Sequence, residues 1–468
     1  MLSLQHTNFL SPVAQMTKSC QETPLSLLPN EILSDIILLS AVPLDIFVWK
    51  SPILSISATW RACALDTPRL WSCIHVTGKT HASERLACWI QRSGDGCPLH
   101  LIVHNLKAFR ALETSWLTPD SIPNAGRRIH SLMLATMDQD ENAPLPLYFD
   151  ATNLRDLDIF TVGLMFRDLT PHPFFCDAPS ICLKRLRLSC SFPSSEWVAM
   201  RMLDAFTLTT LILSGEFSCH DILDITIRAP LLEQLECDIK VESADADESP
   251  QPLVKCDSLR RLMLRGKTTA VDLLRIIETP SLQRFFVSGG WRAEELLQII
   301  QFSAKCRKLT HLKINAIDKS LSAPQVAALL YALPRLEYID LKWDQYNIKG
   351  LLALCGEFPK STAKSHANRP WACRNVSRFQ LPLSRLEIVY PHGRRYISKY
   401  LKRIIDVRGP RKPLDIGNSI LERPGNDSPR PLIFVVDVPH STLSSIVGDE
   451  WIASRMECVN SLEFPGVL

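Results

Sequence analysis

Apolar residues recur through much of this chain in one spacing, apolar-x-x-apolar-x-apolar. Ten such triplets begin at residue 129; successive triplets start 23 to 29 residues apart, and the last follows after 47. Chance alone would give a loose triplet about every 25 residues in a chain this apolar. Leucine, however, fills the first position in nine of the ten and the fourth position in eight. The triplets are Ile129/Leu132/Leu134, Leu154/Leu157/Ile159, Leu183/Leu186/Leu188, Leu208/Leu211/Leu213, Leu232/Leu235/Cys237, Leu259/Leu262/Leu264, Leu282/Phe285/Val287, Leu309/Leu312/Ile314, Leu336/Ile339/Leu341 and Leu383/Leu386/Ile388.

The segments between triplets carry turn and helix signals. Pro230, Pro280 and Pro334 precede three of the predicted strands, and amphipathic helices are predicted over 271–277, 293–300, 324–331 and 348–354. One strand and one helix in each unit of this length is the period of a leucine-rich repeat. The sequence therefore predicts an α/β fold, an irregular leucine-rich-repeat solenoid with parallel strands on the concave side and helices outside. A non-repeating α/β fold with parallel strands is the alternative.

The predicted repeats depart from the leucine-rich-repeat pattern at one position. The asparagine that this family carries three residues after the third apolar position is absent, and Ser191, Glu216 and Lys267 stand there. That asparagine normally satisfies backbone groups in the turn. Its absence indicates an irregular solenoid.

A separate apolar pattern marks the N-terminal part of the chain. Ile32, Leu33, Ile36 and Ile37 recur at steps of three and four, which predicts a helix with one apolar face starting near Pro29. A second helix is expected after residue 43 and a third over 53–65. This cluster is too small and too apolar to hide all its surface, so we expect it to dock on another surface.

This stretch resembles an F-box. The matching residues are Leu28-Pro29-x-Glu31-Ile32-Leu33, then Ile56-Ser57-x-x-Trp60, then Leu70-Trp71, and the segment 60–71 looks like the F-box-like proteins abundant in mushroom-forming fungi. Ile56-Ser57 replaces the family's Val-Cys. The resemblance covers about a tenth of the chain. An ordinary helical hairpin that packs on its own domain is the alternative.

The resemblance implies a Skp-type adaptor as partner and, through it, a cullin-RING ligase. The residues expected to contact the adaptor are Leu28, Pro29, Ile32, Leu33, Ile36, Ile37 and Trp60. Some of them must belong to the internal core instead, Trp60 first among them.

The predicted organisation follows from these patterns. Residues 1–23 form a flexible tail, 24–75 the F-box, and 76–128 a connecting helix (81–92) and strand (99–103) that start the solenoid. Residues 129–407 form the solenoid, 408–429 a linker rich in Pro, Gly and Arg, and 430–468 a C-terminal strand (432–436) and cap.

Composition narrows the possible functions. The 468 residues include 52 basic and 49 acidic side chains, a formal charge of +3, so net charge predicts neither nucleic-acid nor membrane binding. The fifteen cysteines contain no Cys-x-x-Cys pair, and no metal or other cofactor is predicted. No secretory signal and no apolar membrane span are evident, so we expect a cytoplasmic or nuclear protein. Motifs for hydrolase, metalloprotease, phosphate-loop or dinucleotide chemistry are absent.

Residues between the apolar positions of each strand should face the concave side, where solenoids bind partners. Asp156, Asp158, Gln234, Glu236 and Asp238 are expected there. The residues predicted to bind substrate are Arg185, Arg187, Arg261, Arg265, Arg284, Phe286, His311 and Lys313, with Trp291 nearby. Such a basic surface suits an acidic degron or a phosphorylated partner. The alternative is a solvated face without a partner.

These patterns together predict a non-catalytic recognition protein. The F-box resemblance implies that it is the substrate-recognition subunit of an SCF-type E3 ubiquitin ligase whose repeats hold a protein substrate. One alternative is a leucine-rich-repeat interaction scaffold that is not incorporated in a ligase. Another is an enzyme whose site carries no recognisable motif.

Overall fold

The computed structural model describes residues 28–40, 55–76, 82–104, 126–136, 152–161, 182–190, 206–215, 217, 219–239, 253–266, 269–316, 321–341, 348–355, 378–381, 399–400, 402–403, 433–436 and 459–461. The predicted tail, the predicted linker, the helix expected after residue 43 and the triplet Leu383/Leu386/Ile388 lie outside these ranges. The chain divides into two compact units, Met1–His130 and Ser131–Leu468.

The first unit begins with the two helices α1 (Asn30–Ser40) and α3 (Ala58–Leu65). The carbonyl of Pro29 accepts the first hydrogen bond of α1 from the Leu33 amide at 3.0 Å, so this helix begins where the sequence predicts. The third predicted helix starts later than expected. Ser57 is its N-cap, with an extended backbone and a hydroxyl that accepts from the Trp60 amide at 3.1 Å. The predicted start at residue 53 is therefore wrong.

The rest of the first unit is a parallel strand pair with a connecting helix. The 3-10 helix η3 (Pro68–Trp71) leads into β1 (Cys73–Val76), which pairs with β2 (Leu99–Val103), and α4 (Ala82–Arg92) joins them. The helix α4 and the strand β2 confirm the helix predicted over 81–92 and the strand predicted over 99–103. A second 3-10 helix, η4 (Gly126–Arg128), ends the unit, and the Arg128 guanidinium donates to the Cys97 carbonyl at 3.1 Å and to Ser93 Oγ at 2.5 Å.

The second unit is built on a parallel sheet whose strands lie side by side in chain order. Because each strand pairs with its neighbour in the parallel sense, a crossover must return the chain to the same end after every strand. The strands are β3 (Ile129–Thr136), β4 (Asp156–Thr161), β5 (Arg185–Cys190), β6 (Thr210–Gly215), β7 (Gln234–Ile239), β9 (Arg261–Gly266), β11 (Arg284–Gly289), β12 (His311–Ala316) and β13 (Tyr338–Leu341).

The apolar triplets form the core of this unit. Every residue of the nine triplets that lie in described segments is buried. Their middle residues also face one another across successive strands in one unbroken row, because each strand pairs in the same register. This row consists of Leu132, Leu157, Leu186, Leu211, Leu235, Leu262, Phe285, Leu312 and Ile339.

Backbone hydrogen bonds repeat with the same period. The same turn occurs at Pro230, Pro280 and Pro334. In each turn, the carbonyl of the residue before the proline accepts a hydrogen bond from the amide of the first leucine of the next triplet, at 3.0 to 3.2 Å. These turns confirm the turn signals in the sequence. A second bond pattern recurs at the strand entrances, where one carbonyl accepts from two consecutive amides of the following unit. The acceptors are the carbonyls of Arg155, Lys184, Thr209, Glu233, Arg260, Gln283 and Thr310.

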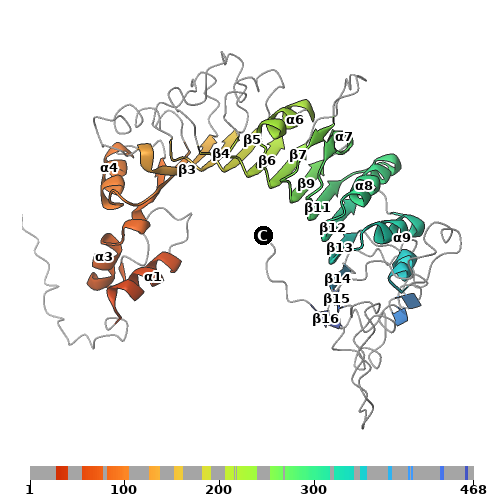
Figure 1. Cartoon of the computed structure of the whole chain (residues 1–468). Helices are drawn as coiled ribbons and strands as arrows, with labels where there is room; N and C mark the ends of the chain where they lie inside the picture. The colour runs from red at the N-terminus through yellow and green to blue at the C-terminus, as the bar shows by residue number, and fades with distance from the viewer. Residues whose placement is uncertain are drawn as a thin grey trace, which may run out of the picture. The chain divides into compact units, whose positions relative to one another are not determined.

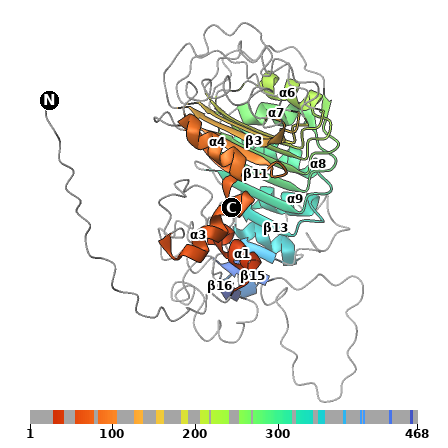
Figure 2. The same ribbon diagram turned by 90° about the vertical axis from the view of Figure 1, so that its left-hand side faces the viewer.

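The described α-helices of the second unit lie on one face of its sheet. Figure 1 shows α6 (Cys219–Arg228), α7 (Thr269–Ile276), α8 (Ala293–Lys305) and α9 (Ala323–Ala332) on the same side of strands β6 to β13, and the turned view in Figure 2 agrees. The predicted helices over 271–277, 293–300 and 324–331 are thereby confirmed. The fourth is a 3-10 helix, η6 (Ile348–Cys355), rather than an α-helix. We call the opposite sheet face the open face.

Two smaller sheets complete the described part of this unit. The strands β8 (Val254–Lys255) and β10 (Ile277–Glu278) pair in parallel beside α7. The strands β14 (Arg378–Leu381), β15 (Ile433–Val436) and β16 (Val459–Ser461) form a second parallel sheet. The strand predicted over 432–436 is thus present.

Candidate functional site

The seven residues predicted to contact an adaptor fall into two groups. Leu33, Ile37 and Trp60 are buried between α1 and α3, where they pack with Cys63 and Ala64 into a small core. Leu28 and Ile36 are half-buried, and Pro29 and Ile32 are exposed. The buried group holds the two helices together. Ile36 packs against the same core, so Pro29 and Ile32 are the solvent-exposed members of the predicted set.

Three large apolar side chains are exposed to solvent, two on α1 and one just before α3. Ile32 is 47% exposed, Leu39 88% and Ile56 53%. Leu39 and Ile56 were not among the predicted contact residues, although their apolar character was visible in the sequence. Large exposed apolar groups that gather in one short segment are typical of protein-interaction surfaces.

Polar contacts fix the helix pair to the segment that follows it. Thr67 donates its hydroxyl hydrogen to the Cys63 carbonyl at 2.7 Å, and its oxygen lies 3.0 Å from Ser34 Oγ on α1. The buried Trp71 donates its indole N–H to the Ala64 carbonyl at 3.0 Å. The Arg92 guanidinium lies 4.7 Å from the centre of the Trp71 ring. The closing tryptophan of the F-box-like pattern therefore anchors α3 to its neighbours.

The open face of the second unit carries the residues that alternate with the buried triplet positions. Because neighbouring strands pair in register, these residues form two rows across the sheet. Successive residues of a row lie about 4.8 Å apart, the distance between neighbouring strands. The first row is Ser131, Asp156, Arg185, Thr210, Gln234, Arg261, Arg284, His311 and Tyr338. The second row is Met133, Asp158, Arg187, Ile212, Glu236, Met263, Phe286, Lys313 and Asp340.

All eight residues predicted to bind substrate lie on strands β5, β9, β11 and β12, at the alternating positions of the open face. Their neighbours change how several of them can act. Arg261 pairs with Glu236 at 3.1 Å, and Lys313 pairs with Asp340 at 2.8 Å. Two of the predicted cations are thus already neutralised by acidic residues of adjacent strands.

Arg187 is also engaged within the protein. Its guanidinium carbon lies 4.8 Å from the centre of the Phe160 ring, a cation–π contact across β4 and β5. Asp158 faces Arg187 in register, and burial raises the pKa of the Asp158 carboxyl while Arg185 and Arg187 oppose that shift. This corner of the open face is therefore internally balanced.

Arg185, Arg265 and Arg284 are the predicted cations that remain exposed. Arg284 lies between Arg261 and His311 in the first row. Burial lowers the pKa of His311, and the charge of Arg284 lowers it further, while Glu337 acts in the opposite direction.

The structure corrects the expectation for one aromatic residue, Trp291, and adds another, Tyr338, to the open face. Trp291 was expected near the binding surface, but it is buried with 1% of its surface exposed and takes no part in the open face. Tyr338 was not predicted, yet its ring stacks on His311 with a centroid distance of 5.7 Å and an interplanar angle of 25°. Aligning the triplets would have found Tyr338, since it occupies the same strand position as His311.

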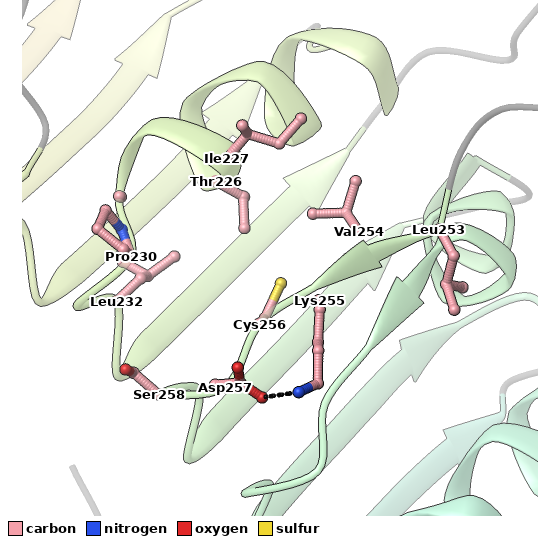
Figure 3. A pocket seen from close by; sticks show the side chains of 11 residues that line it. Thr226, Ile227, Pro230, Leu232, Leu253, Val254, Lys255, Cys256, Asp257 and Ser258 are labelled. Atoms are coloured by element: carbon pink, nitrogen blue, oxygen red, sulfur yellow. Dashed lines mark ion pairs between the residues drawn. The ribbon is translucent and has the colours of Figure 1, made fainter.

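A cavity of about 410 Å³ lies elsewhere, beside the C-terminal end of α6 and the strand β8 (Figure 3). Ile227, Leu253 and Val254 contribute apolar side chains, and the ion pair of Lys255 with Asp257 at 3.0 Å lies among the lining residues. Burial raises the pKa of the Cys256 thiol to about 11, with a smaller contribution from Asp257, so this thiol is protonated and a poor nucleophile at neutral pH.

Within the segments that the structure describes, no three or more His, Cys, Asp or Glu side chains converge on a possible metal position. The imidazoles of His75 and His104 form a pair, with Nδ1 of His75 3.2 Å from Nε2 of His104. None of the described helices combines the length and apolarity needed to cross a membrane.

No model of a known protein family matches this chain, and no curated protein matches it either.

Proposed function

We propose that this chain is a substrate-recognition subunit of an SCF-type E3 ubiquitin ligase. Its N-terminal helices act as an F-box that binds a Skp-type adaptor and, through it, a cullin-RING ligase. Its parallel strands act as a divergent leucine-rich-repeat solenoid that holds a protein substrate on the open face. The chain itself is non-catalytic and works in the cytoplasm or nucleus, where it raises the local concentration of substrate near the ubiquitin carrier.

The observation that carries this proposal is the apolar surface left on the N-terminal helices. Their own core takes up Leu33, Ile37 and Trp60, yet Ile32 and Leu39 remain in solvent on α1. Each large apolar side chain that a partner covers contributes about 1.5–3 kcal/mol. The F-box-like residues Leu28-Pro29-x-Glu31-Ile32-Leu33 coincide with this helix start.

The repeating part of the chain supports the second half of the proposal. One register and one backbone hydrogen-bond pattern recur from β4 to β13, and one turn recurs before β7, β11 and β13. Stacked units of this kind leave one long face for a partner, because each unit buries its apolar side only against its neighbours and the helices. The open face has the alternating exposed side chains that such binding needs.

Co-purification with a Skp-type adaptor tests the proposal. We expect Ile32→Ser to reduce adaptor recovery at least about tenfold, since it removes an exposed apolar contact without disturbing the core. Leu297→Ser is the matched control, because Leu297 is 44% exposed on α8 in the second unit. The double variant Leu28→Ala with Pro29→Ala should act like Ile32→Ser and leave the second unit folded.

Equal adaptor recovery for Ile32→Ser, the Leu28/Pro29 double variant and the Leu297→Ser control would contradict the ligase function. If no adaptor is recovered with the unaltered chain, the interaction-scaffold function replaces it, with the helix pair acting as a packing element. Affinity purification followed by mass spectrometry reports adaptor and substrate in the same experiment.

A further inference from the structure

We propose that Arg284 and His311, which face each other across β11 and β12, form a binding site for an anionic side chain of a protein partner. The anion is a carboxylate or a phosphate group, which share the negative oxygens that a guanidinium and an imidazolium bind. The inference rests on the proposed function, since it requires the open face to hold a protein.

Arg284 is distinguished by the absence of a counter-charge. In the described segments, the cations Arg261 and Lys313 on either side of β11 each have an acidic partner within 3.1 Å, whereas Arg284 has none. Its facing residues in the row are another arginine, Arg261, and His311. An anion placed there would gain attraction from an exposed guanidinium and would break no existing ion pair.

The hydrogen bonds of His311 indicate which ring nitrogen is available. Thr310 donates its only hydroxyl hydrogen to the Gln283 carbonyl at 3.1 Å, and its oxygen lies 2.9 Å from His311 Nδ1. With the Thr310 hydrogen directed to the Gln283 carbonyl, Nδ1 carries a proton and donates to Thr310. Nε2, on the other side of the ring, is then the nitrogen that gains a proton when the imidazole becomes charged.

The surroundings hold these groups in place. Tyr338 stacks on the His311 ring and fixes its orientation. Phe286 lies two residues beyond Arg284 on the same face of β11, under the Arg261 guanidinium at 5.7 Å. Its half-buried ring offers an apolar surface to the hydrocarbon part of the bound side chain.

Charged groups around His311 set the pH response of the site. Arg284 opposes protonation of the imidazole and Glu337 favours it, while Lys313 on the same strand is neutralised by Asp340. A bound anion adds negative charge beside the ring and thereby raises its pKa. Binding should consequently take up a proton and strengthen as the pH falls.

Fluorescence anisotropy with the full-length chain tests the site. The probes are three labelled peptides of equal length, rich in glutamate, in phosphoserine and in glutamine. We expect both acidic peptides to bind and the glutamine peptide not to bind. Arg284→Gln should weaken the acidic peptides about tenfold or more, the loss of one charge-assisted hydrogen-bonded contact. The control Arg307→Gln removes an exposed arginine outside the two rows and should change affinity less than about twofold.

The pH profile provides a second measurement. Affinity for the glutamate peptide should rise from about pH 8 to about pH 6 in the unaltered chain, because its carboxylates stay ionised throughout, whereas phosphoserine itself gains a proton near pH 6. His311→Gln should remove that rise while keeping the overall fold, which circular dichroism and thermal unfolding can verify. The relative affinity for glutamate and phosphoserine identifies which anion the site prefers.

Several results would overturn the inference. The first is that neither acidic peptide binds. The second is that Arg284→Gln and Arg307→Gln weaken binding equally. The third is that a single-stranded DNA binds with the same dependence on Arg284. The adaptor experiment separates this failure from that of the ligase proposal, because it probes only the N-terminal helices. Adaptor binding with no effect of Arg284 contradicts the anion site alone.

Discussion

Replacing Lys313 by methionine should destabilise the second unit rather than only weaken a surface charge. Lys313 on β12 lies directly opposite Asp340 on β13, and their charged atoms are 2.8 Å apart. The Asp340 side chain is 8% exposed and the Lys313 side chain 36%. Lys313→Met would therefore leave a carboxylate that is almost completely withdrawn from water without its counter-charge.

The size of the effect follows from the two exposures. Breaking a fully buried pair by removing one partner costs about 3–5 kcal/mol, and an exposed pair contributes only about 0.2–1 kcal/mol. Since water still reaches Lys313, we expect Lys313→Met to lower the free energy of unfolding by about 2 kcal/mol. The double variant Lys313→Met with Asp340→Leu should lie within about 1 kcal/mol of the unaltered chain, because no unpaired charge remains.

Urea unfolding combined with hydrogen exchange at β12 and β13 measures both quantities in the second unit. Lys308→Met is the matched control, since Lys308 is an exposed lysine just before β12. The reasoning is wrong if Lys313→Met costs no more than Lys308→Met. It is also wrong if the double variant is as unstable as the single one, which would mean that lost packing rather than the stranded carboxylate sets the cost.

Three further predictions concern local structure. Burial and, secondarily, the charge of His104 lower the pKa of His75 to about 4. Because the pKa is lower in the folded than in the unfolded state, the first unit should lose about 1 kcal/mol of stability as the pH falls from about 6.5 to about 4, a value discounted for the solvent that reaches this half-buried ring. His75→Gln should flatten that pH dependence of the free energy of unfolding in urea. A Cβ on Gly289 would lie 1.9 Å from the Gly266 carbonyl oxygen, so Gly289→Ala should lower the free energy of unfolding by about 1–3 kcal/mol in the same assay, and an unchanged value would contradict the close approach. Ser57→Ala should cost about 1 kcal/mol by removing the N-cap of α3, while Ser57→Asp should restore it.

The sequence was most informative where one physical requirement repeats. Each strand of the second unit must bury the same side, so leucine recurs at the same spacing and the nine strands from β3 to β13 could be placed from it. The start of α3 was missed for the opposite reason. The apolar spacing in the sequence continues upstream through Ile53 and Ile56. However, the Ser57 hydroxyl accepts a hydrogen bond from the Trp60 amide as the N-cap, so α3 begins only after Ser57. Local capping outweighs periodicity at that position.

The sequence predicted on which face of the sheet the candidate binding residues lie, but it did not predict their ion-pair partners within the protein. Alternation along a strand places Arg261 and Lys313 on the open face without any knowledge of the fold. Their neutralisation by Glu236 and Asp340 depends on how strands far apart in sequence are aligned. Superposing the triplets gives that alignment, since their middle residues share one row. Burial of Trp291 was not foreseeable, because it follows the strand in a segment without a repeated pattern.

The doubled amide-to-carbonyl bonds at the strand entrances have a consequence for how this protein can diversify. They run between main-chain atoms, from the Arg155 carbonyl at β4 to the Thr310 carbonyl that serves β13, so they make no demand on side-chain identity except that proline cannot donate. Open-face residues that make no ion pair with a neighbouring strand can consequently be exchanged without breaking these backbone bonds. The chemical character of the open face can thus vary widely between related sequences while the hydrogen-bonded backbone beneath it keeps one geometry.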